Sequence, residues 1–333
     1  MFCLEGENRE RCVDAVPDLD WRGQPARAVC QAPPQTQDAA LETSLVAGAG
    51  KLLHALDTAQ NSDGGWGYRS ANSWTEPTAL AALALNAYGC DGPAYRRGCA
   101  WLAARQHEDG GWSPNDMVST STWVTSLAFL ALAERIRFRQ RLAIQWMKNA
   151  VNQDPSRFER FIFGALRLTP PKVAGASPWF PGTAGWVIPT CLNLLSLSRA
   201  ARMTNDSELT SIMADSRSFL LTHCCRDGGW NHGGSSYRSE NAPSYPETTG
   251  LALLALGDVP YAKLAPAIQV AESFLDRAES SEGLAWLQMG LTKQGKPPRS
   301  ESATFACHTL RDVALRLLGI AASSPRNQLV GAG

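Results

Sequence analysis

Two glutamates occupy matching positions in two segments of this chain. Glu76 and Glu247 each follow an aromatic residue, Trp74 or Tyr245, by two positions, and each precedes a threonine by two. A carboxyl group held neutral beside an apolar surface can donate a proton, and aromatic faces can stabilise a resulting cation. A glutamate in the first turn of a helix also interacts favourably with the helix dipole. The sequence leaves both roles open.

The other positions in this register are also mostly polar or aromatic. They are Ser121 and Trp123, Trp186 and Ile188, and, in the last segment, either Glu301 or the pair Cys307 and His308. The last segment is ambiguous because Thr304 and Thr309 both match the repeated threonine. Carboxylates beside aromatic rings suit an apolar, electron-rich ligand. Whether these side chains meet depends on the elements that carry them.

These segments belong to a repeated helix pair. Asp63–Trp66 recurs as Asp109–Trp112 and as Asp227–Trp230, with the sequence Asp-Gly-Gly-Trp in all three copies. Each copy follows an amphipathic run and precedes an almost uninterrupted apolar run. Looser copies are centred on Trp179 and Trp286. The five tryptophans are 46, 67, 51 and 56 residues apart, as expected for a helix pair with its two connections.

The two helices of each pair differ in where their apolar residues lie. The first is apolar on one face and is expected outside, whereas the second is apolar all round and must be buried. In the loop between them the glycines permit a tight turn, and the tryptophan wedges neighbouring repeats. Five pairs are clear, and a sixth would have to come from Met1–Ala40 or Phe158–Leu168. The predicted inner helices contain Leu80–Tyr88, Ser126–Ala133, Cys191–Leu197, Leu251–Leu256 and Leu310–Leu318.

The segment Gly98–Gln106, followed by Asp109–Trp112, resembles the Gln–Trp repeat of squalene-hopene and oxidosqualene cyclases. Looser versions of this repeat occur in protein prenyltransferase β-subunits, and the resemblance extends over about Leu41–Gly319. It implies an all-α fold, an α/α toroid whose inner and outer rings contain about five to six helix pairs. It also implies that the inner helices start at the mouth of a central cavity.

This architecture brings the residues in the shared register to the cavity. The expected catalytic residues are Glu76, Glu247 and His308, and the expected substrate-binding residues are Trp74, Ser121, Trp123, Trp186, Tyr245 and Cys307. The cyclases of this family protonate their substrate with the middle aspartate of an Asp-x-Asp-Asp-Thr-Ala motif. In the matching segment here Glu76 takes the acid position, and Trp74 and Pro77 replace the flanking aspartates.

The prenyltransferases of the family hold zinc with aspartate, cysteine and histidine. The matching segment Ser244–Thr249 contains no cysteine, and the adjacent residues Cys307 and His308 would point about 100° apart on a helix. A second ligand-rich stretch, His223–His232, lacks the separated Cys-x-x-Cys pairs of zinc sites. We therefore expect no metal and no other cofactor.

The amino-acid composition argues against several classes of function. The chain has 31 Lys+Arg and 31 Asp+Glu among 333 residues, and this balance argues against nucleic acid as a partner. No apolar stretch is long enough to predict a membrane span. The N-terminal segment lacks the apolar core of a signal peptide, and nine cysteines without regular pairing favour a reducing compartment. We expect a cytoplasmic protein.

The favoured hypothesis is an enzyme similar to terpenoid cyclases that acts on an isoprenoid or another apolar small molecule by carboxylic acid or base catalysis. One alternative is a non-catalytic toroid scaffold that binds a lipid or a protein partner. Another is a zinc-dependent subunit similar to prenyltransferases. The expected organisation is an extension over residues 1–40, a toroid over 41–320 with an insertion around 157–173, and a tail over 321–333.

Overall fold

The computed structural model describes residues 39–69, 72–133, 137–154, 162, 165–166, 173–234, 242–298 and 305–332. These residues form helices joined by loops, and two isolated β-bridges are the strand-like pairings among them. The predicted all-α class is confirmed. The helices are α1 (Ala39–Thr58), α2 (Thr75–Ala87), α3 (Pro93–Ala104), α4 (Val124–Leu132), α5 (Arg137–Asn149), α7 (Val187–Met203), α8 (Ser207–Thr222), α9 (Pro246–Ala255), α10 (Tyr261–Asp276), α11 (Ser281–Lys293), α12 (Leu310–Ile320) and α13 (Gln328–Ala332).

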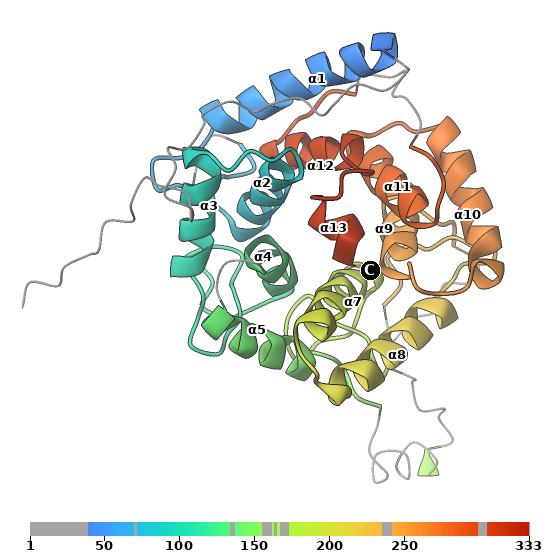
Figure 1. Ribbon diagram of the computed structural model, residues 1–333. Coiled ribbons are helices and arrows are strands. Elements are labelled where there is room, and N and C mark those ends of the chain that lie inside the picture. The colour runs from blue at the N-terminus through green and yellow to red at the C-terminus, as the bar shows by residue number, and fades with distance from the viewer. Residues whose placement is uncertain are drawn as a thin grey trace, which may run out of the picture.

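Six helices form a closed inner ring (Figure 1). In ring order they are α2, α4, α7, α9, α11 and α12, and α12 packs back against α2. These helices are apolar on nearly every side, so a position between the outer helices and the ring interior buries them almost completely. All five predicted inner segments lie in this ring, which confirms the predicted α/α toroid.

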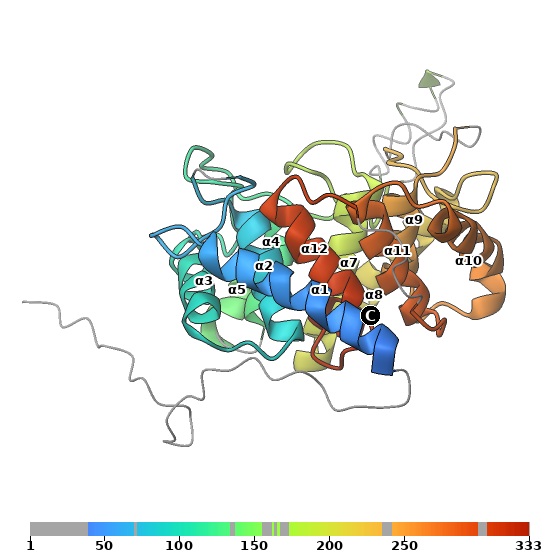
Figure 2. The same cartoon turned by 90° about the horizontal axis from the view of Figure 1, so that it is seen from above.

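Five helices, α1, α3, α5, α8 and α10, form the outer ring. Each packs against one or two inner helices and turns its polar face outward, as predicted from its amphipathic pattern. Figure 2 shows α1 lying across α12, so the first described helix covers the last inner helix. The two ends of the repeat array are therefore joined by direct packing.

The sixth inner helix is α11, and the sequence analysis misassigned it. Trp286 is not a loop tryptophan, because it lies in the middle of α11 and is 5% exposed. The helix begins after Ser280, whose hydroxyl accepts a hydrogen bond from the N–H of Gly283, and it packs very closely on α9. A Cβ on Gly290 would lie 2.2 Å from the carbonyl oxygen of Gly250, so this contact requires glycine. The other expected sources of a sixth pair, residues 1–40 and 158–168, lie almost wholly outside the described residues.

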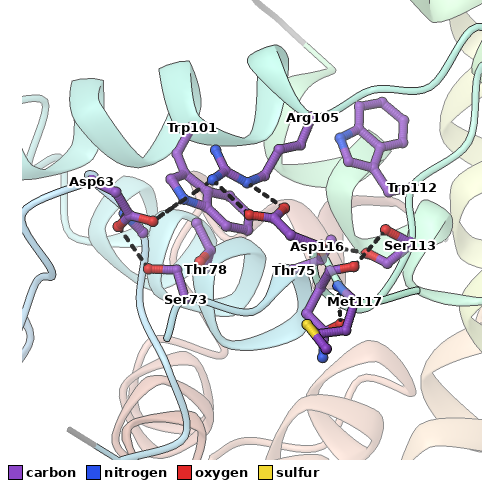
Figure 3. Close-up of polar contacts among 12 residues, drawn as sticks. Asp63, Ser73, Thr75, Thr78, Trp101, Arg105, Trp112, Ser113, Asp116 and Met117 are labelled. Carbon is purple, nitrogen blue, oxygen red and sulfur yellow. Dashed lines mark hydrogen bonds and ion pairs between the residues drawn. The ribbon is translucent and has the colours of Figure 1, made fainter. Parts of the chain in front are cut away.

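The Asp-Gly-Gly-Trp loops join outer to inner helices by one repeated set of hydrogen bonds. In the first copy the indole N–H of Trp66 donates to the carbonyl of Leu56 in α1 at 2.8 Å. Its backbone N–H donates to the Thr78 hydroxyl in α2 at 2.9 Å. The carboxylate of Asp63 accepts from Ser73 and from the Trp101 indole of the next repeat, as Figure 3 shows. The second and third copies repeat both tryptophan contacts. The Trp66 ring also packs against α3 of the next repeat, where a Cβ on Gly98 would lie 2.5 Å from it, and this contact confirms the predicted wedge role.

The ring is covered at the end where its inner helices finish. There α13 packs against α2, α4, α7 and α11, with Leu329 completely buried. The side-chain amide of Asn327 donates to the carbonyls of Leu318 and Ala321 at the end of α12. Residues 321–333, expected as a tail, thus contribute a helix to the packed structure. No helix among the described residues is both long and apolar enough to cross a membrane.

Candidate functional site

The first turns of all six inner helices surround one cavity of about 410 Å³. Ligand pockets generally fall between about 300 and 1,000 Å³, so this volume suits a small molecule. The cavity lies at the end of the ring opposite α13. Its lining consists of Tyr68, Glu76, Leu80, Trp123, Leu127, Trp179, Ile188, Leu192, Glu247, Leu251, Glu282, Trp286, Thr309, Arg311 and Asp312.

The lining is built in two layers because residues four apart share one face of a helix. The mouth layer consists of Glu76, Trp123, Ile188, Glu247 and Glu282. Four residues further along the same helices comes the floor layer, which consists of Leu80, Leu127, Leu192, Leu251 and Trp286. The floor is therefore apolar throughout, whereas the mouth has carboxylates on α2, α9 and α11 and apolar groups on α4 and α7.

Arg311 bridges two of the mouth carboxylates. Its Nε donates to Glu76 Oε1 at 2.5 Å, and its Nη2 donates to Glu282 Oε1 at 2.6 Å. Burial by itself would raise the pKa of Glu282, but the hydrogen bond and charge of Arg311 outweigh it and hold this pKa below its ordinary value. Burial alone would lower the pKa of Arg311, yet the hydrogen bond to Glu282 and the charges of both glutamates raise it. The bridge is a fixed charge network that joins α2, α11 and α12.

Tyr68 completes this network from the loop before α2. Its hydroxyl donates a hydrogen bond to Glu76 Oε2. Burial and, secondly, the neighbouring Glu76 charge raise the pKa of Tyr68 well above its ordinary value, so the phenol keeps its proton. Glu76 thus receives hydrogen bonds on both oxygens, from an arginine and from a tyrosine. Glu76 is therefore tied by both of its oxygens to the side chains of this network.

Glu247 lies outside the Arg311 bridge. Its side chain is 29% exposed and lines the cavity from the first turn of α9. The Nε2 atom of His232 lies 4.0 Å from Glu247 Oε1, and the imidazole stacks obliquely on Tyr245 with ring centroids 5.3 Å apart. A carboxylate facing the cavity thus has a half-exposed imidazole beside it at the rim.

Two tryptophans line the wall of the cavity at the start of α4. The rings of Trp123 and Trp179 meet edge to face with centroids 4.9 Å apart, and the N–H of Trp123 donates to the carbonyl of Trp179 at 3.3 Å. The sequence analysis read Trp179 as a wedge of a degenerate repeat. In the structure Ser177 takes the wedge position, because its N–H bonds to the Thr190 hydroxyl at 2.8 Å. Trp179 is therefore available to line the cavity.

Three of the expected site residues lie at the central cavity: Glu76, Glu247 and Trp123. Ser121 is instead part of the repeat framework, since its hydroxyl donates to Asp109 at 2.8 Å. Trp74 precedes α2 and packs edge-on against Tyr68, with centroids 5.5 Å apart. Trp186 and Tyr245 precede α7 and α9 and are about one-third exposed, outside the cavity lining.

Cys307 and His308 line a second pocket rather than the central one. Thr309 is not the repeated threonine, because it is the N-cap of α12, the position that Trp74 has in α2, and forms a reciprocal capping box with Asp312. The position of the repeated threonine is taken by Val313, four residues after the cap. Thr304 and Glu301 lie outside the described residues. With Thr309 as the cap, the first turn of α12 brings Arg311 to the cavity mouth, and residues 307 and 308 fall before the helix.

Most of the charged network was not predicted from the sequence. Glu282 was hidden because its segment was assigned to a loop, and Tyr68 and Arg311 carry no repeated signal at all. A signal for Glu282 does exist. It precedes an apolar residue by four, as Glu76 precedes Leu80 and Glu247 precedes Leu251.

The described residues contain no group of three or more His, Cys, Asp or Glu side chains arranged to hold a metal ion. Among the described cysteines Cys90 is disulfide-bonded. The others carry thiols: Cys99, Cys191, Cys224, Cys225 and Cys307. A bridged cysteine was not expected for a reducing compartment, so the cytoplasmic location stays a prediction.

Comparisons with solved structures identify a shared fold. The chain is similar to the GH76 α-mannanase of Bacteroides thetaiotaomicron, at 10% identity and a TM-score of 0.55, over 85% of this chain and 95% of that chain. It is similar to an α-amylase from Clostridium perfringens, at 9% identity and a TM-score of 0.54, over 82% and 97%. The type II terpene cyclase MstE from Scytonema is more distant, at 14% identity and a TM-score of 0.49, over 88% and 84%.

These likenesses extend to architecture alone, because identities of 9% and 10% show a shared fold and a fold does not determine chemistry. No protein-family model matches the sequence, and no curated protein matches it significantly. The chemistry of this chain has to be argued from its own cavity.

Proposed function

We propose that the protein is an enzyme that binds a flexible apolar molecule, such as a linear isoprenoid, in the central cavity and acts on it with Glu247 as acid or base. The observation that carries this proposal is the two-layered lining. Five inner helices contribute an apolar floor of four leucines and Trp286 beneath a mouth that contains carboxylates.

The floor supports an apolar ligand over a sugar. Sugar hydroxyls need hydrogen-bond partners, and burying them against hydrocarbon leaves them unsatisfied at a cost of about 1–3 kcal/mol each. The leucine layer presents no such partners, whereas burial of an aliphatic chain there gains about 25 cal/mol per Å² of apolar surface. Glycoside hydrolases share this fold, but this lining favours a hydrocarbon substrate.

Glu247 is a better candidate than Glu76 for proton transfer. Glu76 is engaged by both Arg311 and Tyr68, and a carboxylate in such an ion pair is poorly suited to donate a proton. Glu247 faces the cavity with His232 at 4.0 Å as a route for proton exchange with solvent. The alternative function is ligand binding without catalysis. The salt bridges that Glu76 and Glu282 form with Arg311 favour this alternative, because they give these two glutamates a structural role.

The test is turnover of linear isoprenoids by wild type and by Glu247→Gln, with products identified by gas chromatography and mass spectrometry. Loss of an acid or base is expected to lower kcat by about 100-fold or more while ligand affinity changes by less than about twofold. The matched control is Glu279→Gln, at an exposed glutamate that is not part of the cavity lining. A Glu247→Gln enzyme as active as this control would contradict the proposal. Binding without turnover in wild type would support the alternative.

A further inference from the structure

A second pocket adjoins the central cavity. Its volume is about 500 Å³, and it lies between the end of α1, the loop that follows α1 and the start of α12. Most of the residues that line it have polar side chains, among them Thr58, Asn61, Tyr68, Arg69, His308 and Thr309. We call it the outer pocket.

Tyr68 and Thr309 line both the outer pocket and the central cavity. Tyr68 is held in place from three sides. Its hydroxyl bonds to Glu76, its carbonyl accepts from the N–H of Leu310 at 2.8 Å, and its ring packs on Trp74. Tyr68 and Thr309 thus form the boundary between the two spaces, and a ligand that occupies both would have to extend past these two residues.

The two spaces differ in charge. The central lining contains Glu76, Glu247, Glu282 and Asp312 against a single arginine, which is already bridged to two of the glutamates. In the outer lining the charged residue is Arg69, accompanied by the exposed imidazole of His308. An anionic group would be repelled at the mouth of the central cavity and attracted beside Arg69.

We propose that the outer pocket binds the anionic end of a ligand whose apolar part lies in the central cavity. The inference rests on the proposed function, because it takes the central cavity as the seat of the hydrocarbon. The anion is a carboxylate or a phosphate ester, both of which pair with a guanidinium by charge-assisted hydrogen bonds. Arg69 supplies the charge, and His308 and the neighbouring polar side chains supply further hydrogen-bonding groups.

The test is isothermal titration calorimetry with three probes of one chain length: geraniol, geranic acid and geranyl monophosphate. Wild type is expected to bind at least one anionic probe about tenfold or more tightly than geraniol. Arg69→Gln is expected to reduce this preference to about twofold or less while the Kd of geraniol stays the same. Arg141→Gln, at an exposed arginine of α5, is the matched control and is expected to keep the preference. Preference for only one of the two anionic probes identifies the ligand chemistry.

A second variant tests the pocket itself. Thr58→Phe places a ring in the outer pocket without touching the central lining, and it is expected to weaken binding of the anionic probe but not of geraniol. Equal binding of all three probes by wild type, or an anion preference that survives both Arg69→Gln and Thr58→Phe, would overturn the inference and leave the proposed function standing. If wild type binds none of the three probes, the proposed function is contradicted, and this inference, which rests on it, is contradicted as well.

Discussion

Arg311 decides what the mouth carboxylates do. It is largely buried at the first turn of α12 and pairs with Glu76 on α2 and Glu282 on α11. An arginine between two carboxylates satisfies charges that would otherwise be expensive to bury. The same residue therefore stabilises the place where the repeat array closes and leaves Glu247 as the mouth glutamate outside the bridge.

The bridge has a pH dependence whose sign follows from the lowered pKa of Glu282. A depressed folded-state pKa gives stabilisation that is present above the ordinary value of 4.5 and is lost as the pH falls through the folded pKa. Arg311→Met is expected to destabilise the protein by on the order of 3 kcal/mol at pH 7, since it removes the positive charge that balances two largely buried carboxylates. Thermal unfolding curves of wild type and variant should converge as the pH falls from 6 to 3.

The control for this prediction is Arg217→Met. Arg217 pairs with Asp258 at the surface, between the outer helix α8 and the segment before α10, where ion pairs contribute about 0–1 kcal/mol. An Arg311→Met variant no less stable than Arg217→Met at pH 7, or a difference that persists unchanged at pH 3, would contradict the account of the bridge.

Residue-level roles could be read from the sequence where they repeat and not where they occur once. The three copies of Asp-Gly-Gly-Trp made the wedge role of Trp66 predictable. Arg311 bonds to Glu76, which lies 235 residues away in the chain, and Tyr68 bonds to the same glutamate only eight residues away. Neither contact recurs in another repeat, so no sequence pattern predicts it. Trp179 and Trp286 were misread because a tryptophan at roughly the repeat spacing satisfies the pattern whether it packs in a loop or lines a cavity.

At the scale of the elements, the connections between outer and inner helices are the most constrained parts of the fold. The first glycine of each Asp-Gly-Gly-Trp loop has a positive φ, and in the second copy Gly110 has φ of 91°. A Cβ there would also lie 2.3 Å from the carbonyl carbon of Leu142 in α5. The glycine thus serves both the turn and the close approach of the next outer helix.

Gly182 offers a matched comparison for Gly110. It has φ of 78°, and a Cβ on it would meet nothing within 4 Å. Gly182→Ala is expected to destabilise by about 1–2 kcal/mol, the strain of alanine in the left-handed region alone. Gly110→Ala adds the clash with α5, so it should be destabilising by about 2 kcal/mol more, within the range for overpacked sites. Urea unfolding measures both, and equal losses would contradict the close-approach role.

The helices were predicted correctly where amphipathic outer helices alternate with apolar inner helices along the chain. The prediction failed where this alternation is interrupted. Outer amphipathic and inner apolar runs alternate from α1 to α10, and the predicted inner segments there are correct. Between α11 and α12 no outer helix intervenes among the described residues, so two inner helices follow one another. Because the prediction assumed that each inner helix follows an outer one, it did not identify α11.

At the scale of the whole molecule, closure of the ring turns six helix ends into one site. The inner helices deliver their first turns to the cavity, while α13 covers the end where they finish. Ligands are therefore expected to enter at the carboxylate-bearing mouth and to extend toward the leucine floor. The toroid and two of its mouth glutamates were predicted from the sequence. The apolar floor could not be predicted, because it depends on which face each of the six inner helices turns toward the cavity.

The measurement that tests the central claim most directly is a fluorescence titration with farnesol, because Trp123, Trp179 and Trp286 line the cavity. Wild type is predicted to show saturable quenching at one ligand per chain. Leu192→Gln, which places an amide on the floor, is predicted to weaken binding about tenfold, the equivalent of about 1.4 kcal/mol, while the exposed control Leu142→Gln binds as wild type does. Circular dichroism confirms that both variants are folded. Quenching that does not saturate, or equal affinities of Leu192→Gln and Leu142→Gln, would contradict a ligand site in the central cavity.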